Sequence, residues 1–282
     1  MENIFKNPKE LVDSLKNEGY VIGERLSVAL YLALAKGKPL FLEGEAGVGK
    51  TEIAKTLASI LKTPLIRLQC YEGLDISQSS YEWNYGKQLI SIQSTDNKNI
   101  DLFSKEFLIE RPLLRALRQK PSERAVLLID ELDRADEAFE AYLLEFLSDW
   151  QITIPEIGSI KTEEPPIVVI TSNRTREVHD ALKRRCYYSW VDYPDKDTEL
   201  EILKHRVPQT GPTLQTELVN FVQHLREEEL YKSPGIAETI DWAEALVELN
   251  CVALDPQTID STIGVLLKYQ DDIAKIQGSE AS

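Results

Sequence analysis

Eight consecutive residues, Gly44-Glu45-Ala46-Gly47-Val48-Gly49-Lys50-Thr51, have the types and spacing that suit the binding of a phosphate chain. Glycines allow backbone angles that aim successive N–H groups at an anion, and the N-terminus of a following helix adds partial positive charge. Lys50 is placed to neutralise the β- and γ-phosphates, and the Thr51 hydroxyl to ligate Mg²⁺. The stretch therefore predicts a binding site for ATP and Mg²⁺.

The residues on either side of this stretch favour the same interpretation. The apolar run Leu40-Phe41-Leu42 opens after Pro39 and is typical of a short buried strand. Apolar residues then recur at helical spacing from Ile53 to Leu61. A strand, a glycine loop and a helix are the context of a phosphate-binding loop, and the alternative is an ordinary glycine turn before a helix.

Two carboxylates and an amide follow other apolar runs. Asp130 and Glu131 end the run that starts at Ala125, and Asn173 ends the run that starts at Ile167. At the ends of buried strands, Asp130 would hold Mg²⁺ through water and Glu131 would polarise water for attack on the γ-phosphate. Asn173 would bond that water or the γ-phosphate. The alternatives are acids that cap a strand-to-helix turn, and an Asx-turn at Asn173.

Two further segments are candidate parts of the site. Arg184 and Arg185 close a short predicted helix before the last strand. They are either an arginine finger offered to a neighbouring subunit's nucleotide or cations that favour the helix dipole. Upstream, Gly19-Tyr20-Val21-Ile22-Gly23 contains small and apolar residues, with Ile22 among them, that could close over the nucleotide base. The same segment is equally compatible with a turn between two helices.

The elements that must position these residues form two predicted domains. Strands at 40–42, 65–69, 125–129, 167–173 and 187–191 alternate with helices, which predicts a parallel α/β sheet in residues 1–194. Beyond Pro194 only helical segments follow, at about 197–207, 213–231, 235–250 and 256–277, so residues 195–282 are expected to form a helical domain. β-Hairpins are predicted at 81–92, which is rich in aromatic residues, and at 151–160.

Composition narrows the functional classes. The formal charge of −15 argues against a general binder of nucleic acid or anionic membrane. No apolar run approaches the ~20 residues that span a bilayer. The three cysteines, Cys70, Cys186 and Cys251, lie far apart without metal-ligand spacing. We therefore expect a cytoplasmic protein in which the cysteines are small core residues.

Taken together, the order of these motifs is that of an AAA+ ATPase. Glu43 to Glu52, Leu128 to Ala135 and Thr171-Ser172-Asn173 resemble the corresponding motifs of the MoxR family. Other stretches are similar to its CoxD-like branch: Arg67 to Asp75, Tyr81 to Tyr85, and Ala237 to Trp242.

The resemblance implies a P-loop αβα sandwich followed by a helical lid, and a nucleotide bound by residues 44–52. It implies a ring, usually a hexamer, that remodels proteins together with a von Willebrand factor A protein. In the CoxD-like branch the client is a metalloenzyme whose metal centre is being assembled.

The lid departs from the family pattern at one position. Many MoxR proteins have an arginine in a Ser-Pro-Arg sequence that senses the γ-phosphate. This chain has Ser233-Pro234-Gly235 instead, so the lid sensor is absent or Lys232 replaces it. The missing arginine keeps a second function open, a nucleotide-gated scaffold with little turnover. A nucleic-acid motor on the same fold is a third, which the acidic charge disfavours.

Overall fold

The computed structural model describes residues 4–94, 100–120 and 124–280. It contains two compact units. The first unit comprises Met1–Leu11, Glu24–Glu43 and Thr51–Trp190, and the second comprises Val12–Gly23, Gly44–Lys50 and Val191–Ser282. Sequence patterns place a domain boundary near Pro194, but they do not predict that residues 12–23 and 44–50 belong to the same unit as the C-terminal helices.

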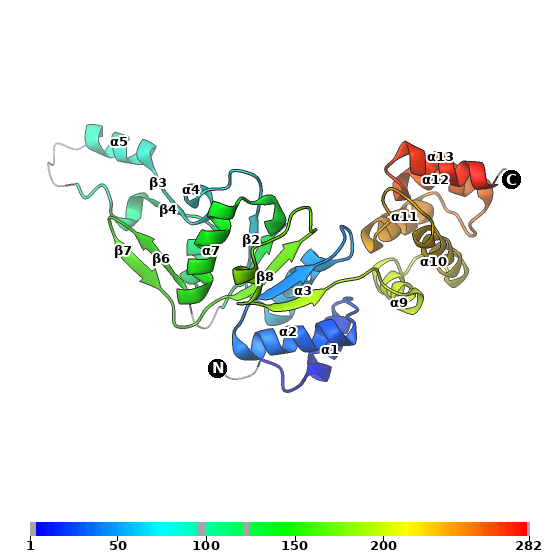
Figure 1. The fold of residues 1–282 in the computed structure, drawn as a ribbon, viewed down its shortest axis with the longest axis horizontal. Helices are drawn as coiled ribbons and strands as arrows, with labels where there is room; N and C mark the ends of the chain where they lie inside the picture. The colour runs from blue at the N-terminus through cyan, green and yellow to red at the C-terminus, as the bar shows by residue number, and fades with distance from the viewer. Residues whose placement is uncertain (1–3, 95–99, 121–123, 281–282) are drawn as a thin grey trace. The chain divides into compact units, whose positions relative to one another are not determined.

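A parallel five-stranded sheet forms the centre of the first unit, in the order β2-β5-β8-β1-β9. Figure 1 labels β2 and β8 in this sheet. Its strands are β1 (Leu40–Glu43), β2 (Leu65–Gln69), β5 (Val126–Asp130), β8 (Ile167–Ser172) and β9 (Tyr187–Trp190). Every residue of β5 and β8 is buried, as expected for central strands covered on both faces. The predicted αβα fold with a parallel sheet is confirmed.

Helices and a continuous apolar core complete the first unit. The core joins sheet residues such as Phe41 and Leu127 to helix residues such as Leu113 and Phe146, all of them fully or almost fully buried. The helices are α1 (Pro8–Asn17), which runs into the second unit, α2 (Glu24–Lys36), α3 (Lys50–Leu61), α4 (Ile76–Ser79), α6 (Pro112–Leu117), α7 (Glu137–Asp149) and α8 (Asp180–Lys183).

The prediction of a β-hairpin at 81–92 is wrong. Only Tyr81–Trp83 is a strand, β3, and it pairs antiparallel with β4 (Leu108–Glu110), while Tyr85–Ser94 forms helix α5. The Asn84 side chain accepts a hydrogen bond from the Lys87 N–H (2.9 Å), which satisfies a free donor in the first turn of α5. By contrast, β6 (Gln151–Ile154) and β7 (Gly158–Lys161) do form an antiparallel hairpin where the sequence predicts one.

The C-terminal part of the second unit is entirely helical (Figure 1). It consists of α9 (Lys196–Arg206), α10 (Pro212–Glu227), α11 (Ile236–Glu248), α12 (Pro256–Leu266) and α13 (Gln270–Glu280). These helices pack around Trp242, whose indole N–H donates to Thr262 Oγ1 (2.8 Å). The single helix predicted at 256–277 is instead two helices, because Leu267 takes an extended conformation (φ −100°, ψ 138°) and is itself buried in the core.

Candidate functional site

The glycine loop joins β1 to α3 in a conformation that glycine adopts more easily than other residues. Gly47 (φ +79°) and Gly49 (φ +90°) both have left-handed backbone angles. Lys50, the first residue of α3, is almost completely buried, and its Nζ donates to the carbonyl oxygens of Gly44 (2.7 Å) and Glu45 (2.5 Å). The lysine ammonium is thus held over the loop whose backbone the sequence assigns to phosphate binding.

Neighbouring residues of the loop have different surroundings. Val48 is buried and Ala46 is half-buried, whereas the Glu45 side chain is exposed. Glu52 pairs with Lys55 on the surface of α3 (3.0 Å), and no role in binding follows from that contact.

The segment between α1 and α2 contributes a residue that sequence reasoning did not single out. The Tyr20 hydroxyl donates to the Gly49 carbonyl oxygen (3.4 Å), so this segment contacts the loop. Ile22 is half-buried in the same segment, within the same unit as the loop. The feature of the sequence that could have identified Tyr20 is its hydroxyl group, which stands in a run of small and apolar residues.

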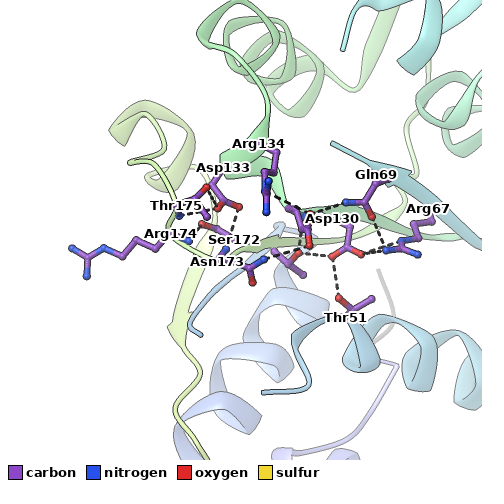
Figure 2. A network of polar contacts seen from close by, with 12 residues as sticks. Thr51, Arg67, Gln69, Asp130, Asp133, Arg134, Ser172, Asn173, Arg174 and Thr175 are labelled. Carbon is purple, nitrogen blue, oxygen red and sulfur yellow. Dashed lines mark hydrogen bonds and ion pairs between the residues drawn. The ribbon is translucent and has the colours of Figure 1, made fainter. Parts of the chain in front are cut away.

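Asp130 lies at the centre of a polar network in the first unit (Figure 2). Its carboxylate is only 2% exposed, and its Oδ1 accepts hydrogen bonds from the hydroxyls of Thr51 (3.0 Å) and Thr171 (2.6 Å). The predicted Mg²⁺ ligands Thr51 and Asp130 therefore lie together, although 79 residues separate them. Thr171 belongs to the predicted Thr171-Ser172-Asn173 motif without a predicted role of its own, and the structure places it in direct contact with Asp130.

Glu131 follows Asp130 in a left-handed conformation (φ 55°, ψ 52°) that is uncommon for a residue other than glycine. Its N–H donates to Thr171 Oγ1 (2.9 Å), which helps to stabilise this conformation. Its two carboxylate oxygens accept from Gln69 Nε2 (3.1 Å) and Asn173 Nδ2 (3.4 Å). Asn173 and Glu131, predicted separately as parts of one site, are thus in contact.

Asp133 holds the loop that carries Asn173. The buried Asp133 carboxylate accepts from the N–H of Asn173 (3.1 Å), the N–H of Thr175 (2.9 Å) and the Thr175 hydroxyl (2.7 Å) (Figure 2). Burial alone would raise the pKa of Asp133, but these hydrogen bonds favour the carboxylate and the pKa is lowered from its usual value. The charged side chain therefore fixes the position of Asn173 relative to β5.

Two residues on β2 enter this network without having been predicted. Arg67 pairs with Asp130, and Gln69 donates to Glu131. They stand two positions apart on β2, where exposed and buried residues alternate, and Gln69 is the register partner of Asp130 on β5. Polar residues at alternate positions of a strand are the sequence signal that could have identified them.

The family now follows from comparison with known proteins. The family described as an AAA domain of the dynein-related subfamily matches residues 39–186, more than half of the chain. The chain belongs to this AAA family. Membership implies nucleotide binding and a P-loop core, in agreement with the loop at 44–51 and the strand-end carboxylates.

Two staphylococcal proteins described only as uncharacterized are similar to this AAA chain. A protein of Staphylococcus haemolyticus is 26% identical over 76% of this chain and 77% of its own length. A protein of Staphylococcus epidermidis is 27% identical over 77% of this chain and 78% of its own length. Among solved structures, a variant of Thermotoga maritima RuvB gives a TM-score of 0.51 at 19% identity, covering 95% of this chain and 75% of that chain. This last similarity shows a shared fold.

The two arginines predicted as a finger lie on the surface of the AAA core. Arg184 pairs with Asp180 at 3.7 Å, and both side chains are about 80% exposed. Arg185 Nη1 donates to the Ala181 carbonyl oxygen (3.4 Å), which is the helix-end contact expected of a capping cation. Within the residues described, the structure does not bring either arginine to Glu131 or Asp130.

The preceding residue, Lys183, ties this helix to β1. Its Nζ contacts both carboxylate oxygens of the buried Glu43 (3.0 and 3.2 Å), which also accepts from the Tyr188 hydroxyl (2.9 Å). Burial and the hydrogen bond to Glu43 raise the pKa of Tyr188 to about 12, so this phenol stays protonated. Glu43 directly precedes the phosphate-binding loop, and this cluster therefore anchors the end of β1.

Gly235, where the resemblance to MoxR proteins leads one to expect an arginine, packs against the phosphate-binding loop. Gly235 is the N-cap residue of α11, close to the start of the helix predicted at about 235–250, and a Cβ atom there would lie 2.9 Å from Gly47 Cα. The Ala237 N–H donates to the Gly47 carbonyl oxygen (3.1 Å), and Glu238 accepts from the Gly235 N–H (3.0 Å). Glycine at position 235 therefore permits a contact that an arginine would prevent.

A cavity of ≈ 630 Å³ adjoins Glu131 in the first unit. Its lining includes Glu131, Tyr71, Arg134 and Cys70. Burial and the nearby Asp130 raise the pKa of the Cys70 thiol to about 12, so it is not a thiolate nucleophile and suits the predicted core role. The cavity gives solvent a place beside the Glu131 carboxylate.

In the part of the chain that the structure describes, no helix is long and apolar enough to cross a membrane. The same residues contain no cluster of three or more His, Cys, Asp or Glu side chains able to hold a metal ion by themselves. A site made of one hydroxyl and one carboxylate is nevertheless typical of Mg²⁺, which keeps several waters and takes further ligands from substrate phosphates.

Proposed function

We propose that this AAA protein binds and hydrolyses Mg·ATP. The observation that carries the proposal is the hydrogen bond between Thr51 Oγ1 and Asp130 Oδ1, with Glu131 and Asn173 in contact beside it. A hydroxyl and a carboxylate oxygen 3.0 Å apart are both oxygen ligands of the kind that Mg²⁺ prefers. The sequence after Glu43 supplies the phosphate-binding loop, and Lys50 and Thr51 are consecutive residues at the start of α3.

Each residue has a distinct role in the proposed reaction. Lys50 and the loop N–H groups neutralise the phosphates, and bound Mg²⁺ would supply charge stabilisation at the β- and γ-oxygens. The Glu131 carboxylate accepts a proton from water as the water attacks, and Asn173 orients that carboxylate through its amide. The cavity beside Glu131 offers room for this water.

We further propose that the protein acts as a MoxR-type ring, with Arg185, and Arg184 beside it, reaching the nucleotide of a neighbouring copy. The exposure of both arginines supports this, because neither is paired with a buried acid among the residues that the structure describes. The motif similarity to the CoxD-like branch supports a remodelling role together with a von Willebrand factor A protein, on a client metalloenzyme. On α5, Tyr85, Leu89 and Ile90 are each about 60% exposed and are available for such contacts.

A nucleotide-gated scaffold is the second candidate, and Gly235 favours it. At the position where the resemblance expects a lid arginine, this chain has a glycine in backbone contact with Gly47. A lid without that cation loses one source of transition-state stabilisation while it keeps a contact that nucleotide binding at the loop could alter.

The test compares wild-type protein with Lys50→Ala, Glu131→Gln and the control Lys55→Ala, an exposed lysine of the same helix. Lys50→Ala should weaken ATP binding by about 10–100-fold, since charged hydrogen bonds contribute about 1.5–3 kcal/mol. Glu131→Gln should bind Mg·ATP normally and lose about 10²–10⁴-fold in kcat. The control should match wild type in both assays.

Other results would redirect the proposal. A wild-type protein that binds ATP tightly without turnover, even when assembled, supports the scaffold. Hydrolysis that DNA stimulates in a salt-dependent manner supports a nucleic-acid motor. Normal ATP affinity in a folded Lys50→Ala variant contradicts the site itself.

A further inference from the structure

Arg67 binds one of the two carboxylate oxygens of Asp130, and the other oxygen has different partners. Its Nε (3.0 Å) and Nη2 (2.6 Å) both donate to Asp130 Oδ2 (Figure 2). The other oxygen, Oδ1, accepts from the hydroxyls of Thr51 and Thr171. Since Arg67 holds Oδ2 with two donors, the carboxylate is fixed with Oδ1 turned toward Thr51.

The same guanidinium also determines which way the Gln69 amide faces. Arg67 Nη2 donates to Gln69 Oε1 (2.6 Å), so the amide oxygen is occupied by a cation. The amide nitrogen is then directed to Glu131 Oε2 (3.1 Å). A flipped amide would bring its NH₂ group against the guanidinium and its oxygen against the carboxylate, which is unfavourable on both sides.

We propose that Arg67 is a positioning residue that orients both carboxylates of the nucleotide site, Asp130 directly and Glu131 through Gln69. The inference rests on the proposed Mg·ATPase function. One arm of the contact presents Asp130 Oδ1 beside Thr51, where Mg²⁺ would be held. The other arm keeps Glu131 in a fixed orientation for water activation. Residues that orient metal ligands in this way typically contribute about 10–100-fold to metal affinity or activity.

A simple surface ion pair is the alternative, because the Arg67 side chain is 54% exposed and exposed pairs contribute little. Two features argue against it. The Asp130 side chain is only 3% exposed, so its charge is poorly solvated without a partner. The guanidinium also bridges two acceptors on different strands, and a planar fork does this more readily than a point charge.

The two arms can be separated by substitution. Lysine is one bond shorter than arginine, so Arg67→Lys should keep a cation beside Asp130 and lose the contact with Gln69. Arg67→Gln should lose the cation, and Gln69→Leu should remove only the arm to Glu131. Arg111→Gln is the matched control, since Arg111 pairs with Glu82 at a similar exposure outside the site.

The experiment measures two quantities. The first is the MgCl₂ concentration that half-maximally tightens binding of a fluorescent methylanthraniloyl-ATP, read without turnover. The second is kcat. Arg67→Gln should raise the Mg²⁺ requirement and lower kcat, each by about 10–100-fold. Arg67→Lys and Gln69→Leu should leave the Mg²⁺ requirement within about threefold and lower kcat by about 10-fold. The double variant Arg67→Lys/Gln69→Leu should lose no more kcat than either single variant, because both substitutions break the same contact with Glu131 through Gln69.

The outcomes distinguish this inference from the proposed function. If wild type and Arg111→Gln bind and hydrolyse Mg·ATP while the folded Arg67 variants match them, only the positioning role is overturned. Additive losses in the double variant also overturn it, since two independent contacts would then be involved. If wild type itself neither binds nor hydrolyses Mg·ATP, the proposed function fails and the inference fails with it. Thermal unfolding of each variant shows whether a loss of Mg²⁺ binding or of kcat reflects a loss of folded protein. If Arg67→Gln does not fold, the folded Arg67→Lys variant supplies the test.

Discussion

Replacing Gly235 by alanine tests the contact between α11 and the phosphate-binding loop. The new Cβ would lie 2.9 Å from both Cα and the carbonyl carbon of Gly47. Carbon atoms normally pack at about 3.5–4.0 Å, so the two segments must separate by about 0.6–1 Å. That separation lengthens the 3.1 Å hydrogen bond from the Ala237 N–H to the Gly47 carbonyl beyond the usual range.

The free-energy cost follows from these two effects. Overpacking a close contact costs about 1–3 kcal/mol, and a lost hydrogen bond adds about 0.5–1.5 kcal/mol. The control is Gly211→Ala, because Gly211 is also an extended N-cap residue and a Cβ there meets no atom within 4 Å. Any cost of alanine as an N-cap residue is shared by both variants. We therefore expect Gly235→Ala to lower the free energy of unfolding by about 1.5–4.5 kcal/mol more than Gly211→Ala does.

Urea denaturation, followed by the fluorescence of the tryptophans, measures this difference, and Trp242 reports directly on the second unit. ATP affinity is measured in parallel, because displacement of Gly47 should also weaken phosphate binding. If the two variants unfold within about 0.5 kcal/mol of each other, the glycine contact does not stabilise the second unit and the explanation for Gly235 is wrong.

Three further predictions concern the first unit. Arg185→Ala should bind ATP normally and lose most hydrolysis, and mixing it with Lys50→Ala should restore part of the activity in a concentration-dependent manner; full activity of a strictly monomeric preparation would contradict a finger in trans. Asp133→Asn should destabilise the protein by about 1–3 kcal/mol, since the amide cannot accept the same three hydrogen bonds, whereas the exposed Asp149→Asn should change unfolding little. Trp83→Ala should lower the free energy of unfolding by about 3–5 kcal/mol, because Trp83 is buried against Phe103. By contrast, Ile90→Ser on the exposed side of α5 should leave stability and basal hydrolysis unchanged and reduce only client-dependent activity. Thermal unfolding and ATPase assays measure this difference.

The sequence predicts well those parts of the fold whose conformation depends on residues near one another in the chain. Central parallel strands are buried on both faces, so their unbroken apolar runs, as in β5 and β8, identify them directly. The loop at 44–51 was equally clear, because glycine, lysine and threonine meet a local geometric requirement there. The predicted hairpin at 81–92 is wrong because the pairing of its first strand is not local. The partner of β3 is β4, which begins at Leu108, and pairing over that separation leaves no turn signal in the sequence.

The sequence predicts four of the residues that the structure brings into contact, and it does not predict Arg67 and Gln69, which contact them. Thr51, Asp130, Glu131 and Asn173 follow from motifs at strand and helix ends, and the structure places them in contact. Arg67 and Gln69 contact Asp130 and Glu131 because β2 lies beside β5 in this register. Their alternate positions on β2 are a signal in the sequence, but the strand beside which β2 lies is not. Gly235 is similar, since its sequence shows a missing arginine and only the structure shows what the glycine contacts.

The absence of an arginine at position 235 has a consequence for how hydrolysis would depend on assembly. Within the residues described, Arg67 is bound to Asp130 and Gln69, so its charge is already engaged by the site's own side chains. Lys50 is then the cation of the loop, and in the proposed ring Arg185 of another copy would supply a second cation for the γ-phosphate. A protein built in this way should hydrolyse ATP very slowly at concentrations where it is monomeric and faster as copies assemble. The two candidate functions therefore differ in one measurable respect. The scaffold predicts that turnover stays low in the assembled ring, whereas the remodelling ATPase predicts that turnover rises with assembly and is abolished by Glu131→Gln.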